Sequence, residues 1–465
     1  MFKAYQNIWF LGIGGIGMSA LARYMMHESK HVAGYDRTPT RLTAKLTEEG
    51  ISVVFEDNPA LVPAEFRDAA TTLVVLTPAI HSENRQLKYF QNRNFKIVKR
   101  AQLLGNVSMH YKTIAVAGTH GKTTVSTMLA HLLRQSAVSC TALLGGIAKG
   151  YDTNFFYSPN SPWLVTEADE FDRSFLSLHP HMSVITSTDA DHLDIYGQAE
   201  NLITSFNAFA SQTDDDGILL VKKDAAIHRN LLEEKTIFTY SLTDKSADVY
   251  ASNIRYSSAA MIFDLVMPEG VIKKLQMEAT GIINIENAVA ASFMALQAGI
   301  TEDELRSGLA GFKGVVRRFD KQFSSREVIY IDDYAHHPNE IRALIRSIKS
   351  IYGDRKITGI FQPHLYSRTR DFAEDFARSL EELDQILLLD IYPAREKPIE
   401  NISSATIYHL IDHPRKALVH KETLLEYLND TEPELLLTIG AGDIDKLVLP
   451  IKNMLEKKYQ KPSSS

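Results

Sequence analysis

The sequence has almost no cysteine, no excess of basic residues and no long apolar run. The single cysteine, Cys140, excludes an internal disulfide and is typical of a reducing compartment. Fifty basic residues stand against 57 acidic ones, and a formal charge of −7 gives no support to nucleic acid as a partner. The apolar runs are far shorter than a membrane span, and the N-terminus lacks the layout of a signal peptide. We therefore expect a cytoplasmic protein without membrane insertion.

The chain is also too long for one hydrophobic core, since it has 465 residues. Strand patterns alternate with helix patterns along its length, which is typical of parallel α/β sheets. We predict an α/β fold of three domains, each a mostly parallel sheet flanked by helices. We expect the domains to be residues 1–107, 108–312 and 313–465.

A phosphate-binding loop is the clearest motif. The apolar run from Thr113 to Ala117 leads into Gly118-Thr119-His120-Gly121-Lys122-Thr123-Thr124, and a helical pattern follows. Backbone N–H groups at a helix start, a lysine charge and a threonine hydroxyl suit a nucleoside triphosphate with Mg²⁺. The usual spacing has a glycine where Val116 stands. The alternative is therefore an ordinary βα turn with a basic first helical turn.

A second glycine loop follows the first strand pattern. Gly12, Gly14 and Gly17 have the G-x-G-x-x-G spacing, and Asp36 ends the next strand about twenty residues on, as in dinucleotide-binding units. The motif alone suggests a nicotinamide or flavin enzyme, but any nucleotide diphosphate would fit. A tight turn without a ligand is the other alternative. The loop Thr77-Pro78-Ala79-Ile80-His81 ends another strand, where ligands of open α/β sheets bind.

Polar residues also end strands in the middle segment. Glu167 is the first of four acids after an apolar strand, where a carboxylate that holds Mg²⁺ or orients water is expected; a solvated acidic loop is the alternative. Asp191-His192 fits either a second cation site or a helix cap beside a core histidine. Asn284 and Asn287 lie three apart at a helix start, and could pair with a nucleobase or act as caps.

Four strands of the last segment end in loops rich in His, Arg, Tyr and Asp. These loops begin at Asp332, Gln362, Tyr392 and Gly440. Because the carboxyl ends of parallel strands meet at one edge of a sheet, four such loops predict a lined cleft.

Together these motifs resemble the Mur ligases of peptidoglycan synthesis over nearly the whole chain. The resemblance rests on the phosphate loop and on Glu167-Ala168-Asp169-Glu170, Asp191-His192-Leu193-Asp194, Asn284 with Asn287, Arg317-Arg318-Phe319 and Asp332-Asp333-Tyr334 with His336-His337-Pro338. Within the family, the first glycine loop and Phe361-Gln362-Pro363-His364 favour the member that joins L-alanine to UDP-N-acetylmuramate. The resemblance implies that ATP phosphorylates the lactyl carboxylate and that the amine then displaces phosphate from the acyl phosphate.

The resemblance implies that residues 1–107 and 313–465 are Rossmann-like and that residues 108–312 form a P-loop ATPase domain. It also implies roles for particular residues. The catalytic residues would be Lys122, Glu167, His192, Arg318, His336 and His364. Mg²⁺ would be held by Thr123, Glu167 and His192. ATP would be bound by Gly118, Thr119, His120, Gly121, Lys122, Thr123, Thr124, Asn284, Asn287, Arg318 and Asp333. The two other substrates would be bound by Gly14, Gly15, Ile16, Gly17, Met18, Ser19, Asp36, Thr77, Pro78, Ala79, His81, Arg100, Tyr334, His364 and Arg368.

The sequence departs from the family pattern at two positions. Ile283 stands where a histidine is frequent, and Leu365 stands where many relatives have arginine, so Arg368 or Arg370 must meet an anion there. A ligase that joins a murein tripeptide to the same sugar nucleotide is a close alternative. A Rossmann oxidoreductase and a non-catalytic nucleotide-binding regulator are alternatives from other classes. The expected assembly is a monomer or a weak homodimer.

Overall fold

Three sheets flanked by helices make up the structure, which is a computed structural model that describes residues 2–189, 196, 198–228, 232, 234–256, 260–278, 281–394 and 396–459. Most strand pairs in each sheet are parallel, so the predicted three-domain α/β fold class is confirmed. No helix among these residues combines the length and the apolar character that crossing a membrane requires.

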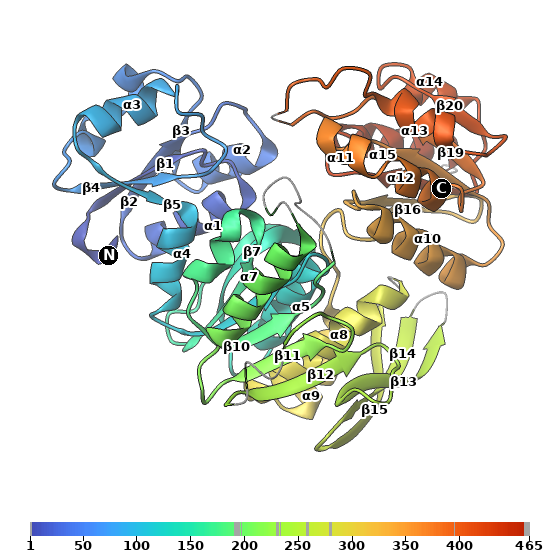
Figure 1. The fold of residues 1–465 in the computed structure, drawn as a ribbon, viewed down its shortest axis with the longest axis horizontal. Helices are drawn as coiled ribbons and strands as arrows, with labels where there is room; N and C mark the ends of the chain where they lie inside the picture. Colours follow the sequence, from blue (N-terminus) through green and yellow to red (C-terminus); the bar gives the residue numbers. More distant parts are fainter. Residues whose placement is uncertain are drawn as a thin grey trace, which may run out of the picture. The chain divides into compact units, whose positions relative to one another are not determined.

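The first sheet has five parallel strands in the order β3-β2-β1-β4-β5 (Figure 1). Its strands are β1 (Asn7–Leu11), β2 (His31–Tyr35), β3 (Ser52–Val54), β4 (Thr72–Leu76) and β5 (Lys96–Lys99). Its helices are α1 (Ile16–His27), α2 (Arg41–Glu48), α3 (Arg85–Asn92) and α4 (Arg100–Ser108). From β1 the chain adds β2 and β3 on one side of the sheet, and it then adds β4 and β5 on the other side. The loops that follow β1 and β4 therefore lie next to each other at the switch in strand order, where open α/β sheets bind ligands.

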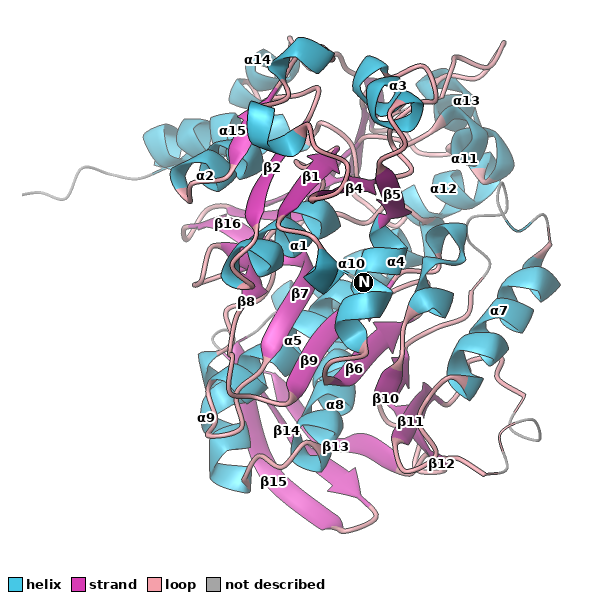
Figure 2. Cartoon of the chain, turned by 90° about the vertical axis from the view of Figure 1, so that its left-hand side faces the viewer, coloured by secondary structure: helices cyan, strands magenta, loops and turns pink. Residues whose placement is uncertain are grey.

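The second sheet has ten strands in the order β15-β14-β13-β12-β11-β10-β6-β9-β7-β8, and Figure 2 shows its central strands side by side. The strands are β6 (Lys112–Ala117), β7 (Thr141–Ala148), β8 (Thr153–Phe156), β9 (Trp163–Ala168), β10 (Pro180–Ile185), β11 (Ile218–Lys222), β12 (Thr236–Ser241), β13 (Val249–Tyr256), β14 (Ala260–Met267) and β15 (Gly270–Glu278). Its helical segments are α5 (Lys122–Arg134), η4 (Phe171–Ser177), α7 (Ala199–Ser211), α8 (Ile282–Gln297) and α9 (Glu302–Gly311).

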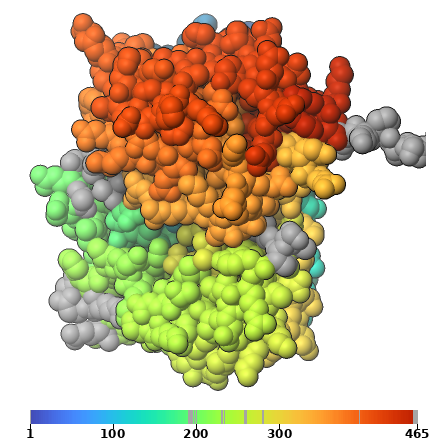
Figure 3. Space-filling model, turned by 90° about the vertical axis from the view of Figure 1, so that its right-hand side faces the viewer, coloured from blue at the N-terminus to red at the C-terminus, as the bar shows by residue number. Residues whose placement is uncertain are grey.

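The sequence analysis did not foresee β11 to β15. The last of these strands, β15, buries only scattered residues, and Val271 within it is half exposed. These outer strands lie at the molecular surface (Figure 3). A strand with so little buried surface has no continuous apolar run, which is the signal that revealed the central strands. This reason does not apply to β11, which has a buried apolar run from Ile218 to Val221 and was still missed.

The third sheet has the order β16-β17-β21-β18-β19-β20, with β16 antiparallel to β17 and the other pairs parallel. Its strands are β16 (Asp320–Ser324), β17 (Ile329–Asp333), β18 (Ile357–Phe361), β19 (Gln385–Leu388), β20 (Lys416–Leu418) and β21 (Leu435–Ile439). Its helices are α10 (Pro338–Tyr352), α11 (Tyr366–Asp371), α12 (Ala373–Leu380), α13 (Ser404–Leu410), α14 (Leu424–Asn429) and α15 (Asp445–Tyr459).

The chain forms two compact units. The first holds residues 1–252, 264–275 and 287–313, and the second holds residues 253–263, 276–286 and 314–465. Within the first unit, one continuous apolar core joins the helices of the first sheet to the second sheet, because Met25 and Val107 belong to the same cluster of buried side chains as Leu143 and Phe175. The first two sheets therefore share a hydrophobic core.

Candidate active site

The phosphate loop connects β6 to α5 as predicted, and its backbone requires glycine. Gly118 has φ +132 and Gly121 has φ +83, a region that other residues rarely adopt. A Cβ on Gly118 would lie 2.1 Å from Thr186 Oγ1. Thr123 and Thr124 are buried in the first turn of α5. The loop thus opens directly onto a helix N-terminus, where backbone N–H groups favour an anion.

This loop is held in place by Thr186 and Ser187, which directly follow β10. Ser187 Oγ accepts the N–H of His120 at 2.8 Å, and the Ser187 carbonyl accepts the N–H of Thr119 at 3.2 Å. Thr186 Oγ1 donates to the Ala117 carbonyl at 3.0 Å. The sequence analysis gave these residues no role, because the pairing of β10 beside β6 is not readable from the local pattern.

The lysine of the loop is bound by an acid that the sequence analysis did not single out. Lys122 Nζ donates to the two carboxylate oxygens of Glu170 at 2.9 and 2.7 Å and to the Gly118 carbonyl at 2.5 Å. Burial opposes the charge of Lys122, but the carboxylates of Glu170 and Asp169 outweigh it and raise the lysine pKa above its ordinary value. Lys122 is therefore held in its charged form.

Glu167 projects from β9 toward the start of α5. Its Oε1 accepts the N–H of Gly145 at 3.1 Å and the hydroxyl of Ser126 at 3.5 Å. The Thr123 carbonyl lies 3.2 Å from the same hydroxyl, so the single hydrogen of Ser126 is shared between these two acceptors. Glu167 and Thr123 are thus linked through one side chain, and both offer the oxygen ligands that Mg²⁺ prefers. Asp191 and His192, the third predicted contribution, lie outside the described residues.

The predicted adenine contacts lie in the first turns of α8. Asn284 and Asn287 are both largely buried. A Cβ on Gly121 would lie 3.1 Å from Asn287 Oδ1, so this amide borders the phosphate loop.

The glycine loop of the first sheet is held by two polar side chains. Asp36 accepts the N–H of Gly14 at 2.8 Å through Oδ2 and the N–H of Thr38 at 3.1 Å through Oδ1. Asn154 of β8 donates to the Ile16 carbonyl at 2.6 Å. Thr77 of the neighbouring loop packs against Gly12. The other predicted residues lie on these two loops and at the start of α1: Gly15, Gly17, Met18, Ser19, Pro78, Ala79 and His81.

Arg100 lies between the glycine loop and the acidic run of the second sheet. Its Nη1 would be 2.9 Å from a Cβ on Gly17, and its Nη2 donates to Asp169 Oδ2 at 3.2 Å. Arg100 was predicted to bind substrate. Asp169, its acidic partner, was not assigned a role from the sequence, although it belongs to the acidic run that the pattern revealed.

In the third sheet, Arg317 forms a buried network with the strand ends. Its Nε donates to Asp332 Oδ2 at 3.1 Å, and its Nη2 donates to the Gly440 carbonyl at 2.5 Å. Asp332 is fully buried and also accepts the hydroxyl of Thr438 at 2.7 Å. Through these contacts, Arg317, which precedes β16, is joined both to β17 and to the end of β21.

The next arginine, Arg318, lies beside two predicted site residues. Its guanidinium stacks 4.9 Å from the ring centre of Tyr334. Asp333 accepts the N–H groups of Phe319 at 2.6 Å and Ala335 at 2.8 Å. Burial raises the pKa of Asp333 to about 6, although the charge of Arg318 opposes this shift. The carboxyl group of Asp333 thus stiffens the turn that presents Tyr334.

A group of aromatic rings follows on the same edge of the third sheet. The His336 ring lies 5.3 Å from that of Tyr334 and 6.0 Å from that of His364, and His364 stacks on Tyr392 at 5.8 Å. Arg368 is largely buried in α11. The structure therefore brings Tyr334, His336 and His364 together at the strand ends, as the strand-end loops predicted, and Arg318, which precedes β16, lies over Tyr334.

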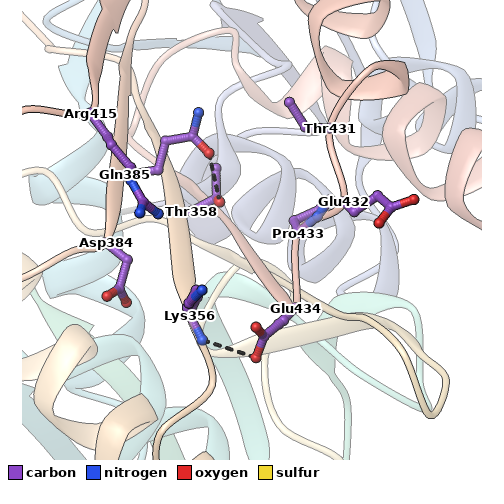
Figure 4. Close-up of a pocket in the computed structure, with 9 residues that line it drawn as sticks. All are labelled: Lys356, Thr358, Asp384, Gln385, Arg415, Thr431, Glu432, Pro433 and Glu434. Atoms are coloured by element: carbon purple, nitrogen blue, oxygen red, sulfur yellow. Dashed lines mark hydrogen bonds between the residues drawn. The ribbon is translucent and has the colours of Figure 1, made fainter.

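One cavity of the third domain, of 220 Å³, lies at the opposite ends of these strands (Figure 4). It is lined by Lys356, Thr358, Asp384, Gln385, Arg415, Thr431, Glu432, Pro433 and Glu434. None of the predicted site residues contributes to it. The same holds for the one group of acidic and histidine side chains close enough to share a metal among the described residues, which is His181, Asp214 and Asp216.

The first compact unit holds two glycine loops that each precede a helix N-terminus, and the strand ends of the third sheet carry arginine and histidine, an arrangement that is typical of α/β enzymes. The chain belongs to the Mur ligase family. The family's catalytic-domain model matches residues 7–112, its middle-domain model matches residues 116–295, and its glutamate ligase domain model matches residues 317–442.

Several curated relatives resemble the chain over almost its full length. The UDP-N-acetylmuramate–L-alanine ligase of Porphyromonas gingivalis is 48% identical over 452 residues, covering 97% of this chain and 99% of the relative. That of Parabacteroides distasonis is 50% identical over 455 residues, covering 98% of each. The crystal structure of UDP-N-acetylmuramate–alanine ligase from Thermotoga maritima matches with a TM-score of 0.81 at 26% identity, covering 98% of this chain and 99% of that one.

Proposed function

We propose that the protein joins L-alanine to the lactyl carboxylate of UDP-N-acetylmuramate with the cleavage of ATP to ADP and phosphate. The observation that supports this most is the full-length identity of 48 to 50% to relatives that have this activity in their names. The protein would act in the cytoplasm, in the synthesis of peptidoglycan precursors.

Each domain has a separate task in this proposal. Residues 1–107 bind the UDP part of the sugar nucleotide through the glycine loop. Residues 108–312 bind ATP through the phosphate loop and α8. Residues 313–465 contribute Arg318 and Asp333 toward ATP, and Tyr334, His336, His364 and Arg368 toward the amino acid and the reacting carboxyl group.

The chemistry requires two anions, a carboxylate and a triphosphate, to approach each other. Lys122 offers a charged donor to the phosphoryl group that is transferred, and Arg100 offers one between the two ligand loops. Arg318, held over Tyr334, adds a third positive charge. These cations offset the repulsion between the reactants and the charge that develops during transfer.

Glu167 and Thr123 would hold Mg²⁺, with His192 as a further ligand. The carboxylate of Glu167 and the hydroxyl of Thr123 fit, since oxygen atoms are the ligands that this hard cation prefers. When bound, Mg²⁺ withdraws negative charge from the phosphate oxygens.

An assay of ADP release with single substrates omitted tests the proposal. We expect ADP only when UDP-N-acetylmuramate, free L-alanine and ATP are all present, because the amine must complete the reaction. Release that requires a murein tripeptide in place of L-alanine would instead support the ligase that joins this tripeptide to the sugar nucleotide. Oxidation of a reduced nicotinamide without ADP release would support the oxidoreductase. The absence of both signals would support the non-catalytic regulator.

The contact between Gly145 and Glu167 gives a test of the metal assignment. A Cβ at position 145 would lie 2.2 Å from Glu167 Oε2, so Gly145→Ala must displace the carboxylate. We expect the Mg²⁺ concentration that gives half-maximal ADP release to rise about 10- to 100-fold, as for other changes that misplace a metal ligand.

Gly311→Ala is the matched control. A Cβ there meets only His131 Nε2, at 3.8 Å, so this variant should need the same Mg²⁺ concentration as the wild type. An unchanged Mg²⁺ requirement in Gly145→Ala would remove Glu167 from the metal site.

A further inference from the structure

The glycine loop of the first sheet leads directly into α1. The N-cap of this helix is Gly15, which has no side chain to accept the N–H groups of the first turn, residues 16–18. Backbone N–H groups at such a position favour an anion. A glycine-rich loop has many accessible conformations, however, so it binds an anion tightly only where its neighbours hold it in one of them.

Asn154 holds the start of α1 from another sheet. Its side chain is completely buried. Its amide nitrogen donates to the Ile16 carbonyl at 2.6 Å and to the hydroxyl of Ser19 at 3.1 Å. Both acceptors lie at the N-terminal end of α1, whereas Asn154 lies on β8 of the second sheet, within the same compact unit. The second sheet therefore fixes the position of this helix N-terminus.

Arg23 fixes the orientation of the Asn154 amide. Its Nη1 donates to Asn154 Oδ1 at 2.6 Å, while its Nε and Nη2 donate to the carboxylate of Glu49 at 2.5 and 3.0 Å. Because a guanidinium has donors only, the oxygen of the amide must face Arg23 and its nitrogen must face Ile16. Arg23 is 3% exposed, but Glu49 balances its charge, so loss of the amide would leave this buried ion paired.

The phosphate loop has different supports. Thr186 and Ser187 bind its backbone, and both follow β10, not β8. Loss of the Asn154 side chain should therefore disturb the glycine loop and leave the phosphate loop in place.

We propose that Asn154 is a positioning residue for the sugar nucleotide: it holds the start of α1 where the N–H groups of the first turn meet the diphosphate. The inference rests on the proposed function, because that function assigns the diphosphate to the glycine loop. A residue within 108–312, the range proposed to bind ATP, thus determines how tightly residues 1–107 bind the other nucleotide.

Calorimetric titrations of UDP-N-acetylmuramate, and of ADP with Mg²⁺, into Asn154→Ala test this role. We expect the affinity for UDP-N-acetylmuramate to fall about tenfold, which corresponds to ~1.4 kcal/mol, and the affinity for ADP to stay within about twofold of that of the wild type. A merely structural role would lower both affinities or neither. An unchanged affinity for UDP-N-acetylmuramate, or an equal loss for both ligands, would overturn the inference.

Asp152→Ala is the matched control, because Asp152 lies in the turn between β7 and β8 and contacts α2 instead of α1. Its carboxylate pairs with Lys45 at 2.9 Å and with Arg41 at 3.2 Å, and it is 57% exposed. Exposed ion pairs contribute little, so both affinities should stay within about twofold of those of the wild type. A loss of UDP-N-acetylmuramate affinity as large as that of Asn154→Ala would count against a specific role of Asn154 and overturn the inference.

Hydrogen exchange of the ligand-free protein is a second measurement. In Asn154→Ala, peptides that cover residues 12–19 should exchange about tenfold faster than in the wild type, and peptides that cover residues 118–124 should exchange at an unchanged rate. Equal exchange of residues 12–19 in both proteins would overturn the inference. If the alanine variant does not fold, Asn154→Asp takes its place, because the carboxylate keeps the contact with Arg23 and has no donor for the Ile16 carbonyl.

The two proposals fail in different ways. Wild-type protein that ligates L-alanine, while Asn154→Ala keeps its full affinity for UDP-N-acetylmuramate, overturns the inference and leaves the proposed function intact. Wild-type protein that binds no UDP-N-acetylmuramate overturns both.

Discussion

Lys122→Ala should reduce the rate of ADP release about a thousandfold, with a smaller effect on the affinity for UDP-N-acetylmuramate. The lysine is held in its charged form at the start of α5, where it can meet the phosphoryl group as charge develops on it. Removal of the side chain takes away this stabilisation in the transition state. Measurements of kcat and of KM for each substrate test the expectation.

Lys112→Ala is the control for this variant. Lys112 begins β6, the strand that leads into the phosphate loop, and it is exposed and lies over the ring of Trp163, so its loss removes the same charge at the far end of that strand. Its kcat should remain close to that of the wild type. A similar loss of rate in both variants would mean that net charge, and not the position of Lys122, matters.

Arg318→Ala should lower kcat about a hundredfold and cost less free energy of unfolding than Arg317→Ala, because the buried Asp333 keeps its two backbone N–H donors. Arg318 is half-buried and stacks on Tyr334, but the described hydrogen bonds of the turn come from its backbone and from Asp333. The side chain is therefore available for a ligand. Steady-state kinetics together with thermal unfolding separate the two quantities.

Arg317→Ala is the contrasting neighbour. It would leave Asp332 buried without its cation, and we expect about 3–5 kcal/mol of lost stability. Loss of Arg318 should thus mainly lower kcat, whereas loss of Arg317 should mainly lower the free energy of unfolding. An Arg318→Ala enzyme with a wild-type ligation rate would contradict the proposed role of the third domain.

The sequence was sufficient for the motifs that lie on one short segment. The phosphate loop and the glycine loop were predicted because their turns need glycine and their helices begin with recognisable patterns. The row formed by Tyr334, His336 and His364 was also foreseen, since parallel strands bring their carboxyl ends to one edge. Local pattern and sheet geometry agree at these places.

The partners of those motifs could not be predicted, because they depend on which strands become neighbours. Ser187 supports the phosphate loop only because β10 pairs with β6. Glu170 reaches Lys122 across 48 residues of sequence, and nothing in the acidic run distinguishes it from Glu167. The same applies to Asp169 beside Arg100. Adjacency between distant segments is decided by packing of the whole sheet and not by any local run.

The shared core of the first two sheets means that the first domain could not be exchanged for another one independently of the second. Asn154 reaches from β8 to the glycine loop, and buried Arg23 joins Asn154 to Glu49. The apolar cluster beneath them is continuous. The first domain is therefore not an exchangeable module: a graft of a different first domain would have to bring its own matching surface for β8, or the glycine loop would lose its alignment with the phosphate loop.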